Sequence, residues 1–124
     1  MKSILLSINP QYVDKIMNGE KKYEYRKIKC KVEVDKMYIY STIPVKKVVG
    51  EAKIECILEG SPQEIWERTK SKSGVSKEFF DSYFRFNKQA YAYKLYDIIK
   101  YDKPKDIKEF GVNYAPQLFC YVDM

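Results

Sequence analysis

The sequence contains no histidine, and this absence excludes several classes of function. Ser-His-Asp and Cys-His nucleophile systems, histidine acid–base catalysis and histidine-ligated metal sites are all ruled out. Cysteine is scarce as well, because only Cys30, Cys56 and Cys120 occur, far apart and without a C-x-x-C pair. An odd, scattered set of thiols is typical of the reducing cytoplasm and not of a disulfide framework or a zinc site. We therefore expect a cytoplasmic protein with no metal and no cofactor.

Long apolar runs are also missing. The first ten residues hold only the short run Ile4-Leu5-Leu6, which is too short for a signal peptide. No stretch approaches the ~20 apolar residues that a transmembrane helix needs. Hydrophobic residues nevertheless make up 45% of the 124 residues, which is enough for a real core. We expect one soluble domain over residues 1–124, with no membrane partner.

The charge that is present is unevenly distributed. The chain has 23 Lys and Arg against 17 Asp and Glu, a net charge of +6 and a pI near 9.1. Residues 21–31 hold one acid, Glu24, and these basic residues: Lys21, Lys22, Arg26, Lys27, Lys29 and Lys31. A local basic cluster can attract a polyanion such as a nucleic acid. It equally fits a solvated, lysine-rich strand, because lysine greatly outnumbers arginine in the whole chain.

Apolar periodicity and turn signals predict a chain of strands interrupted by short helices. The expected strands cover 2–8, 22–29, 37–42, 48–58, 90–99 and 118–122. Helices are expected from Pro10 to Gly19, over 62–69, and after Ser76. Helices do not alternate regularly with strands, which disfavours a doubly wound parallel sheet. We predict an α+β fold: a small, mostly antiparallel, partly closed β-barrel with short helices in its connections.

The helix ends carry clear capping signals. Asn9 and Pro10 suit the N-cap and first position of one helix, and Gly19 suits its left-handed C-cap. The segment 61–64, Ser-Pro-Gln-Glu, reads as a capping box. In the helix after Ser76, four aromatic residues share one face, and we expect all of them in the core: Phe79, Phe80, Tyr83 and Phe84. Tyrosines 91 and 93, in the strand at 90–99, are likewise expected to be packing residues.

A polar cluster is expected where the first helix gives way to a strand. Glu24 and Arg26 lie on one face of that strand because side chains alternate with period two. Lys21 has the opposite parity, and it can join them only from the turn before the strand. Such a cluster can bind a phosphate or a base edge. On spacing alone, it is equally compatible with a surface ion pair between Glu24 and Arg26 that contributes little.

Residues 19–26, Gly-Glu-Lys-Lys-Tyr-Glu-Tyr-Arg, match a G-x-K-x-x-E-x-R signature. In this motif, and in the order of elements around it, the chain resembles the activating-signal-cointegrator homology (ASCH) domains, relatives of the PUA-like barrels. The resemblance implies a PUA-like β-barrel with an RNA or nucleotide site in a basic cleft around Lys21, Glu24 and Arg26. Some small bacterial members hydrolyse acetylated cytidine with a lysine matching Lys21 and a threonine three residues later. This chain has Glu24 at that threonine position, which argues against the amidohydrolase activity.

Three functions remain open. In the first, an RNA-binding module, phosphates contact Lys21, Arg26, Lys27 and Lys46, while Glu24 and Tyr40 contact a base. In the second, a small hydrolase acts on an acylated nucleoside, with Lys21 and Glu24 as the catalytic residues. Ser41 and Thr42 are further candidates to supply a hydroxyl to the cleft. In the third, the domain binds another protein and its cleft is vestigial.

Overall fold

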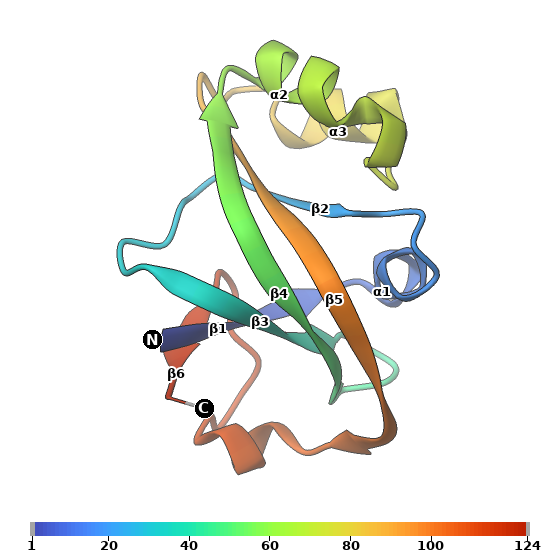
Figure 1. Ribbon diagram of the computed structural model, residues 1–124, viewed down its shortest axis with the longest axis vertical. Coiled ribbons are helices and arrows are strands. Elements are labelled where there is room, and N and C mark those ends of the chain that lie inside the picture. The colour runs from blue at the N-terminus through green and yellow to red at the C-terminus, as the bar shows by residue number, and fades with distance from the viewer. Residues whose placement is uncertain (1, 124) are drawn as a thin grey trace.

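The computed structural model describes residues 2–123, which form one bent sheet with short helices at its ends and on its concave side (Figure 1). The elements in chain order are β1 (Lys2–Ile8), α1 (Pro10–Met17), β2 (Tyr23–Arg26), β3 (Val34–Ser41), β4 (Lys47–Gly60), α2 (Pro62–Thr69), η1 (Lys70–Lys72), α3 (Lys77–Tyr83), β5 (Ala90–Lys105), η2 (Ile107–Phe110) and β6 (Cys120–Val122).

The six strands form a single sheet in the order β2-β5-β4-β3-β1-β6. Every neighbouring pair is antiparallel except β1 and β3, which run parallel. The predicted α+β class and mostly antiparallel pairing are therefore confirmed. Because β2 and β6 are the two edges, the sheet stays open and does not close into a barrel.

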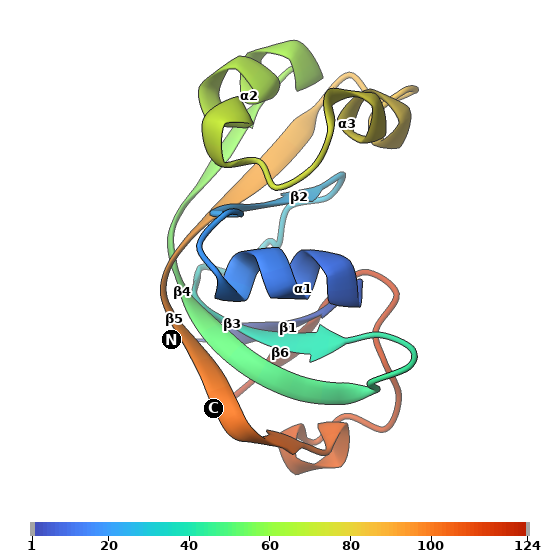
Figure 2. The same cartoon turned by 90° about the vertical axis from the view of Figure 1, so that its right-hand side faces the viewer.

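Strands β4 and β5 run along the length of the molecule and are strongly curved. Their pairing contains three register shifts, between Val48 and Gly50, Glu51 and Lys53, and Ile54 and Cys56. Bulges of this kind bend a strand and increase its twist. The bend creates a concave side that holds α1, while α2 and α3 cover the end of the sheet next to β2 (Figure 2).

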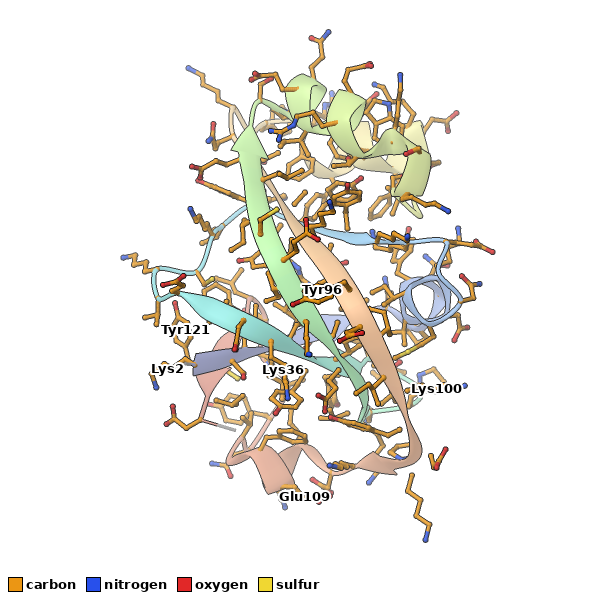
Figure 3. The ribbon with its side chains drawn as sticks, in the orientation of Figure 1. Lys2, Lys36, Tyr96, Lys100, Glu109 and Tyr121 are labelled. Atoms are coloured by element: carbon orange, nitrogen blue, oxygen red, sulfur yellow. The ribbon has the colours of Figure 1, made fainter. Side chains whose placement is uncertain are left out.

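Both faces of the sheet centre are buried. One cluster packs α1 against residues such as Ile4, Met37 and Ile39, and a second packs η2 against Leu5 and Tyr38 on the opposite face. A third cluster joins α2 and α3 to the end of β5. Exposed side chains of the outer face include Lys36 on β3 and Tyr96 on β5 (Figure 3).

The capping signals are largely confirmed, whereas some strands end at other residues than predicted. Gly19 has φ +86° after α1, and Ser61 and Glu64 form the expected capping box of α2. Asn9 occupies the N-cap of α1, although its side chain makes no capping bond. The predicted strand at 22–29 is shorter, because β2 is an edge strand that pairs only with β5 over Tyr23–Arg26. The strand predicted over 90–99 is longer, because β5 continues to Lys105.

The two ends of the described chain lie side by side. Ser3 on β1 is paired with Val122 on β6, and the Lys2 amine is 2.7 Å from Oδ1 of Asp123. Within residues 2–123, no helix is long and apolar enough to cross a membrane.

Candidate functional site

A pocket of about 170 Å³ opens between α1, β2 and α3. Figure 2 shows β2 lying between these two helices. Its polar residues come from the start of β2 and the turn before it, whereas its aromatic walls come from the helices. The residues that determine its chemistry are Lys21, Glu24, Arg26, Tyr12, Phe79 and Tyr83.

Lys21 is held in the turn between α1 and β2, where the alternation of side chains along a strand does not apply. Its backbone N–H donates to the carbonyl of Lys15 at 3.0 Å, and the next amide, that of Lys22, donates to Lys72 at 2.9 Å. The side chain is only 2% exposed, and its Nζ donates to the carbonyl of Ser73 at 2.8 Å. A buried lysine ammonium that keeps a hydrogen-bond partner is typical of a functional or strongly structural position.

Gly74 allows the loop after α2 to pass directly over the Lys21 side chain. Its φ is +70°, a backbone conformation that favours glycine. A Cβ placed at Gly74 would collide with Cβ of Lys21 and lie 2.6 Å from its Cγ. The loop that supplies the Ser73 carbonyl therefore also fixes the path of the lysine side chain.

Glu24 lies between two cations. Nε and Nη2 of Arg26 both donate to Oε2 of Glu24, at 3.1 and 2.8 Å. The other carboxylate oxygen, Oε1, is 3.9 Å from Nζ of Lys21. Arg26 Nη2 also donates to the carbonyl of Ser7 at 2.8 Å, which ties β2 to the end of β1. The Glu24 carboxylate is thus held between the Lys21 amine and the Arg26 guanidinium.

Burial changes the proton affinities of two groups in this site. Burial lowers the pKa of the Lys21 amine; Glu24 opposes this by raising the pKa, while Arg26 and Lys15 lower it further. Burial also raises the pKa of Tyr25 to about 12. Lys21 thus gives up its proton more readily than an exposed lysine, which a general base requires, while Tyr25 stays protonated.

Tyr25 forms the floor beneath Lys21. The Lys21 Nζ lies 4.7 Å from the centre of the Tyr25 ring, within the range of a cation–π contact. The Tyr25 hydroxyl donates to Oγ1 of Thr69 at 2.7 Å, because the Thr69 hydroxyl itself donates to the carbonyl of Ile65. The ring is therefore fixed from below by α2.

The aromatic wall corrects one expectation from the sequence. Phe80 and Phe84 are buried as expected, but Phe79 is 41% exposed and lines the pocket together with Tyr83. The Phe79 ring lies 5.3 Å from that of Tyr12 and is stacked on that of Tyr83 at 6.1 Å. The sequence does carry a signal: residues 79 and 83, and residues 80 and 84, form two adjacent stripes, and only the second faces the core.

The residues proposed from the sequence separate into two groups. Lys21, Glu24 and Arg26 lie together, and the Lys27 Nζ is next to them, 4.7 Å from the centre of the Tyr83 ring. Like Lys27, the other four do not line the pocket. These are Tyr40 and Ser41, which are buried in β3; Thr42, whose hydroxyl donates to Oδ1 of Asn9 at 3.3 Å; and Lys46, which is exposed in the β3–β4 turn.

The physical reason is the position of β3 inside the sheet. Tyr40 points to the η2 side, where it packs in the cluster with Val48 and Phe110. The pocket lies on the α1 side, so a base contact from Tyr40 is not supported. Over residues 2–123, no group of three or more Cys, Asp or Glu side chains is placed to hold a metal ion.

Comparison with known proteins finds relatives over nearly the whole chain. A family model described as a domain of unknown function, DUF365, matches residues 1–115. An ASCH domain-containing ribonuclease from Zymomonas mobilis is 30% identical over 118 residues, which are 93% of this chain and 80% of that protein. The crystal structure of ASCH from Zymomonas mobilis has a TM-score of 0.88 at 25% identity and covers 98% of this chain and 87% of that one.

Two relatives from Ureaplasma parvum are much longer proteins. The ATP synthase subunit alpha is 34% identical over 122 residues, 97% of this chain but 15% of that protein. The large ribosomal subunit protein uL22 is 30% identical over 121 residues, 97% of this chain and 39% of that protein. The chain therefore spans only a minor part of these two relatives.

Proposed function

The chain belongs to the ASCH domain family and also matches the DUF365 family model over residues 1–115, and from this premise we propose that it binds single-stranded RNA, with one nucleotide in the pocket around Lys21. The observation that carries the proposal is the Lys21–Glu24–Arg26 cluster beneath an aromatic wall. A relative named as a ribonuclease supports RNA as the class of ligand.

The cluster offers complementary groups to a nucleotide. Nη1 of Arg26 makes only a 3.5 Å contact, with the carbonyl of Leu118, so it remains available to a phosphate oxygen. Oε1 of Glu24 can accept a hydrogen bond from an exocyclic amine of a base. The exposed ring of Phe79 provides a stacking surface, and stacking contributes roughly 1–3 kcal/mol per base in single-strand binders.

Fluorescence anisotropy with a labelled single-stranded RNA hexamer tests this proposal. We expect affinity to fall as salt rises, because each phosphate contact releases counterions. Arg26→Ala should weaken binding, and Arg85→Ala, which removes an equal charge outside the pocket, should not. Affinity that is independent of salt, or equal losses in the two variants, would contradict the proposal and favour a protein-interaction domain with a vestigial cleft.

A second candidate function is hydrolysis of an acylated cytidine, which the lowered pKa of Lys21 favours. In that reaction Lys21 removes a proton from water, the water oxygen attacks the acyl carbon, and the amine leaves with the proton after the C–N bond breaks. Release of cytidine from acetylated cytidine, lost in Lys21→Met, would establish it. The same RNA incubations, run on a gel, show whether the chain cleaves RNA as its named relative does.

We place this function in the cytoplasm, where the three free cysteines would stay reduced.

A further inference from the structure

A second cavity lies on the other side of Arg26 and Tyr83. It measures about 320 Å³, and these two residues line both cavities. Its remaining lining comes from the end of β2 and from the segment before β6: Lys27, Ile28, Gln117, Leu118 and Phe119. The two cavities are therefore neighbours that share a wall.

The Arg26 guanidinium connects the two cavities chemically. Its Nε and Nη2 are occupied by Glu24 and Ser7 on the side of the first pocket. Its Nη1 points to the carbonyl of Leu118, a residue of the second cavity, and the hydrogen bond between them is long, at 3.5 Å. One edge of the guanidinium is thus fixed, whereas Nη1 makes a single long hydrogen bond and has a second N–H to donate to an anion at the boundary between the cavities.

The charges of the second cavity have a single sign. Arg26 and Lys27 line it, and no carboxylate does. The Lys27 Nζ lies over the Tyr83 ring, next to the boundary. A cavity near β3 and β4 makes a useful contrast, because its two lysines are matched by Glu33 and Glu55. The side chains that line the second cavity therefore favour an anion over a cation, with Lys27 as the cation that no carboxylate of the lining balances.

The remaining lining suits a planar base. Leu118 is 55% exposed and Ile28 is also exposed, so the rim of the second cavity offers apolar surface to a ligand. Gln117 is exposed at the same rim, and its amide has both a donor and an acceptor. An anion at the boundary and a flat, partly apolar group beyond it are the chemistry of a nucleotide.

We propose that the second cavity binds the next nucleotide of the same RNA strand, so that the site reads a dinucleotide step. Arg26 and Lys27 bind the phosphate that links the two nucleotides, and Tyr83 separates their bases. This inference rests on the proposed RNA binding and deepens it. It also distinguishes the ligand from a free nucleoside, which needs only the first pocket.

Length dependence of binding tests the proposal directly. Calorimetry compares a nucleoside monophosphate with a dinucleoside monophosphate. Each carries one phosphate, and the phosphate monoester of the nucleoside monophosphate has the higher negative charge. Stronger binding of the dinucleoside therefore reports the second base and not charge. We expect about tenfold tighter binding of the dinucleoside, from the typical range of base stacking.

Leu118→Ala should remove most of this gain and leave binding of the monophosphate unchanged. Ile99→Ala is the matched control, because Ile99 is also apolar, is 53% exposed, and lines neither cavity. In hexamer titrations, Lys27→Ala should lower the slope of log affinity against log salt by about one, and Lys31→Ala, which lines neither cavity, should not.

The possible failures are distinguishable. Binding of the monophosphate without a gain for the dinucleoside would overturn the second subsite and leave the proposed RNA binding intact. A gain that survives in Leu118→Ala, or that falls equally in Ile99→Ala, would also overturn it. Absence of binding to every nucleotide and to the hexamer would overturn both proposals.

Discussion

Replacing Gly74 by alanine should destabilise the protein by displacing Lys21. The new Cβ would collide with Cβ of Lys21 and lie 2.6 and 2.8 Å from its Cγ and Cδ. Lys21 has little room to move, because its Nζ is hydrogen-bonded to Ser73 and the amides of residues 21 and 22 are both hydrogen-bonded. Overpacking costs about 1–3 kcal/mol, and an L residue at positive φ costs about 1–2 kcal/mol.

Part of this cost is offset in the unfolded state. Alanine restricts the unfolded chain, which adds about 0.4–1 kcal/mol to the free energy of unfolding. The net loss in free energy of unfolding should therefore be about 2–4 kcal/mol, measured by urea denaturation at pH 7. RNA affinity should fall as well, because the Lys21 amine leaves its position beside Glu24.

Gly111→Ala is the matched control for backbone strain. Gly111 has φ +76°, close to that of Gly74, but a Cβ there would meet no atom within 4 Å. It should lose only the cost of positive φ, so the difference between the two variants isolates the collision with Lys21. If Gly74→Ala were no less stable than Gly111→Ala, the reasoning that the loop fixes the lysine would be refuted.

Three further predictions concern the same region. The stability of wild type relative to the Lys21→Met variant should increase as pH rises toward 10.5, because the lowered pKa of Lys21 means that the unfolded state binds more protons than the folded state in this pH range. Urea denaturation of both proteins at pH 8 and 10 tests this direction, and a difference in free energy of unfolding that does not change with pH would contradict it. Tyr25→Phe should cost about 1 kcal/mol through the lost hydrogen bond to Thr69. Because the pKa of Tyr25 is raised to about 12, wild type should lose stability as pH rises above 10, and the phenylalanine variant should lose less in the same titration; equal losses would refute the assignment. Ser61→Ala should cost about 1 kcal/mol by removing the N-cap of α2 and leave RNA affinity unchanged; loss of affinity in anisotropy would show that α2 acts on the site.

The polar half of the site could be predicted because it depends on local rules. Gly19 ends α1, and strand parity puts Glu24 and Arg26 on one face, so Lys21 can join them only from the turn. These constraints act over a few residues and need no knowledge of the rest of the fold.

The aromatic half could not be predicted, because a pocket wall and a core have the same composition. Phe79 and Phe80 are adjacent and chemically identical, and only the docking of α3 decides which one faces the pocket. The side of the sheet to which Tyr40 points could not be predicted for a related reason. β3 is buried on both faces near its end, so alternation no longer distinguishes the α1 side from the η2 side.

Residues 2 and 123 lie side by side, and adjacent ends of this kind suit the insertion of a folded unit into a loop of a host protein. Lys2 and Asp123 are joined by an ion pair, so a host protein would need to open only a narrow gap in a loop to accommodate the domain as an insert. The junction is also remote from the pocket: Ser7, which lines it, is five residues along β1 from Lys2, a separation of about 17 Å in a strand. The junction and the pocket therefore lie apart, so a fusion made through residues 2 and 123 should leave the pocket undisturbed.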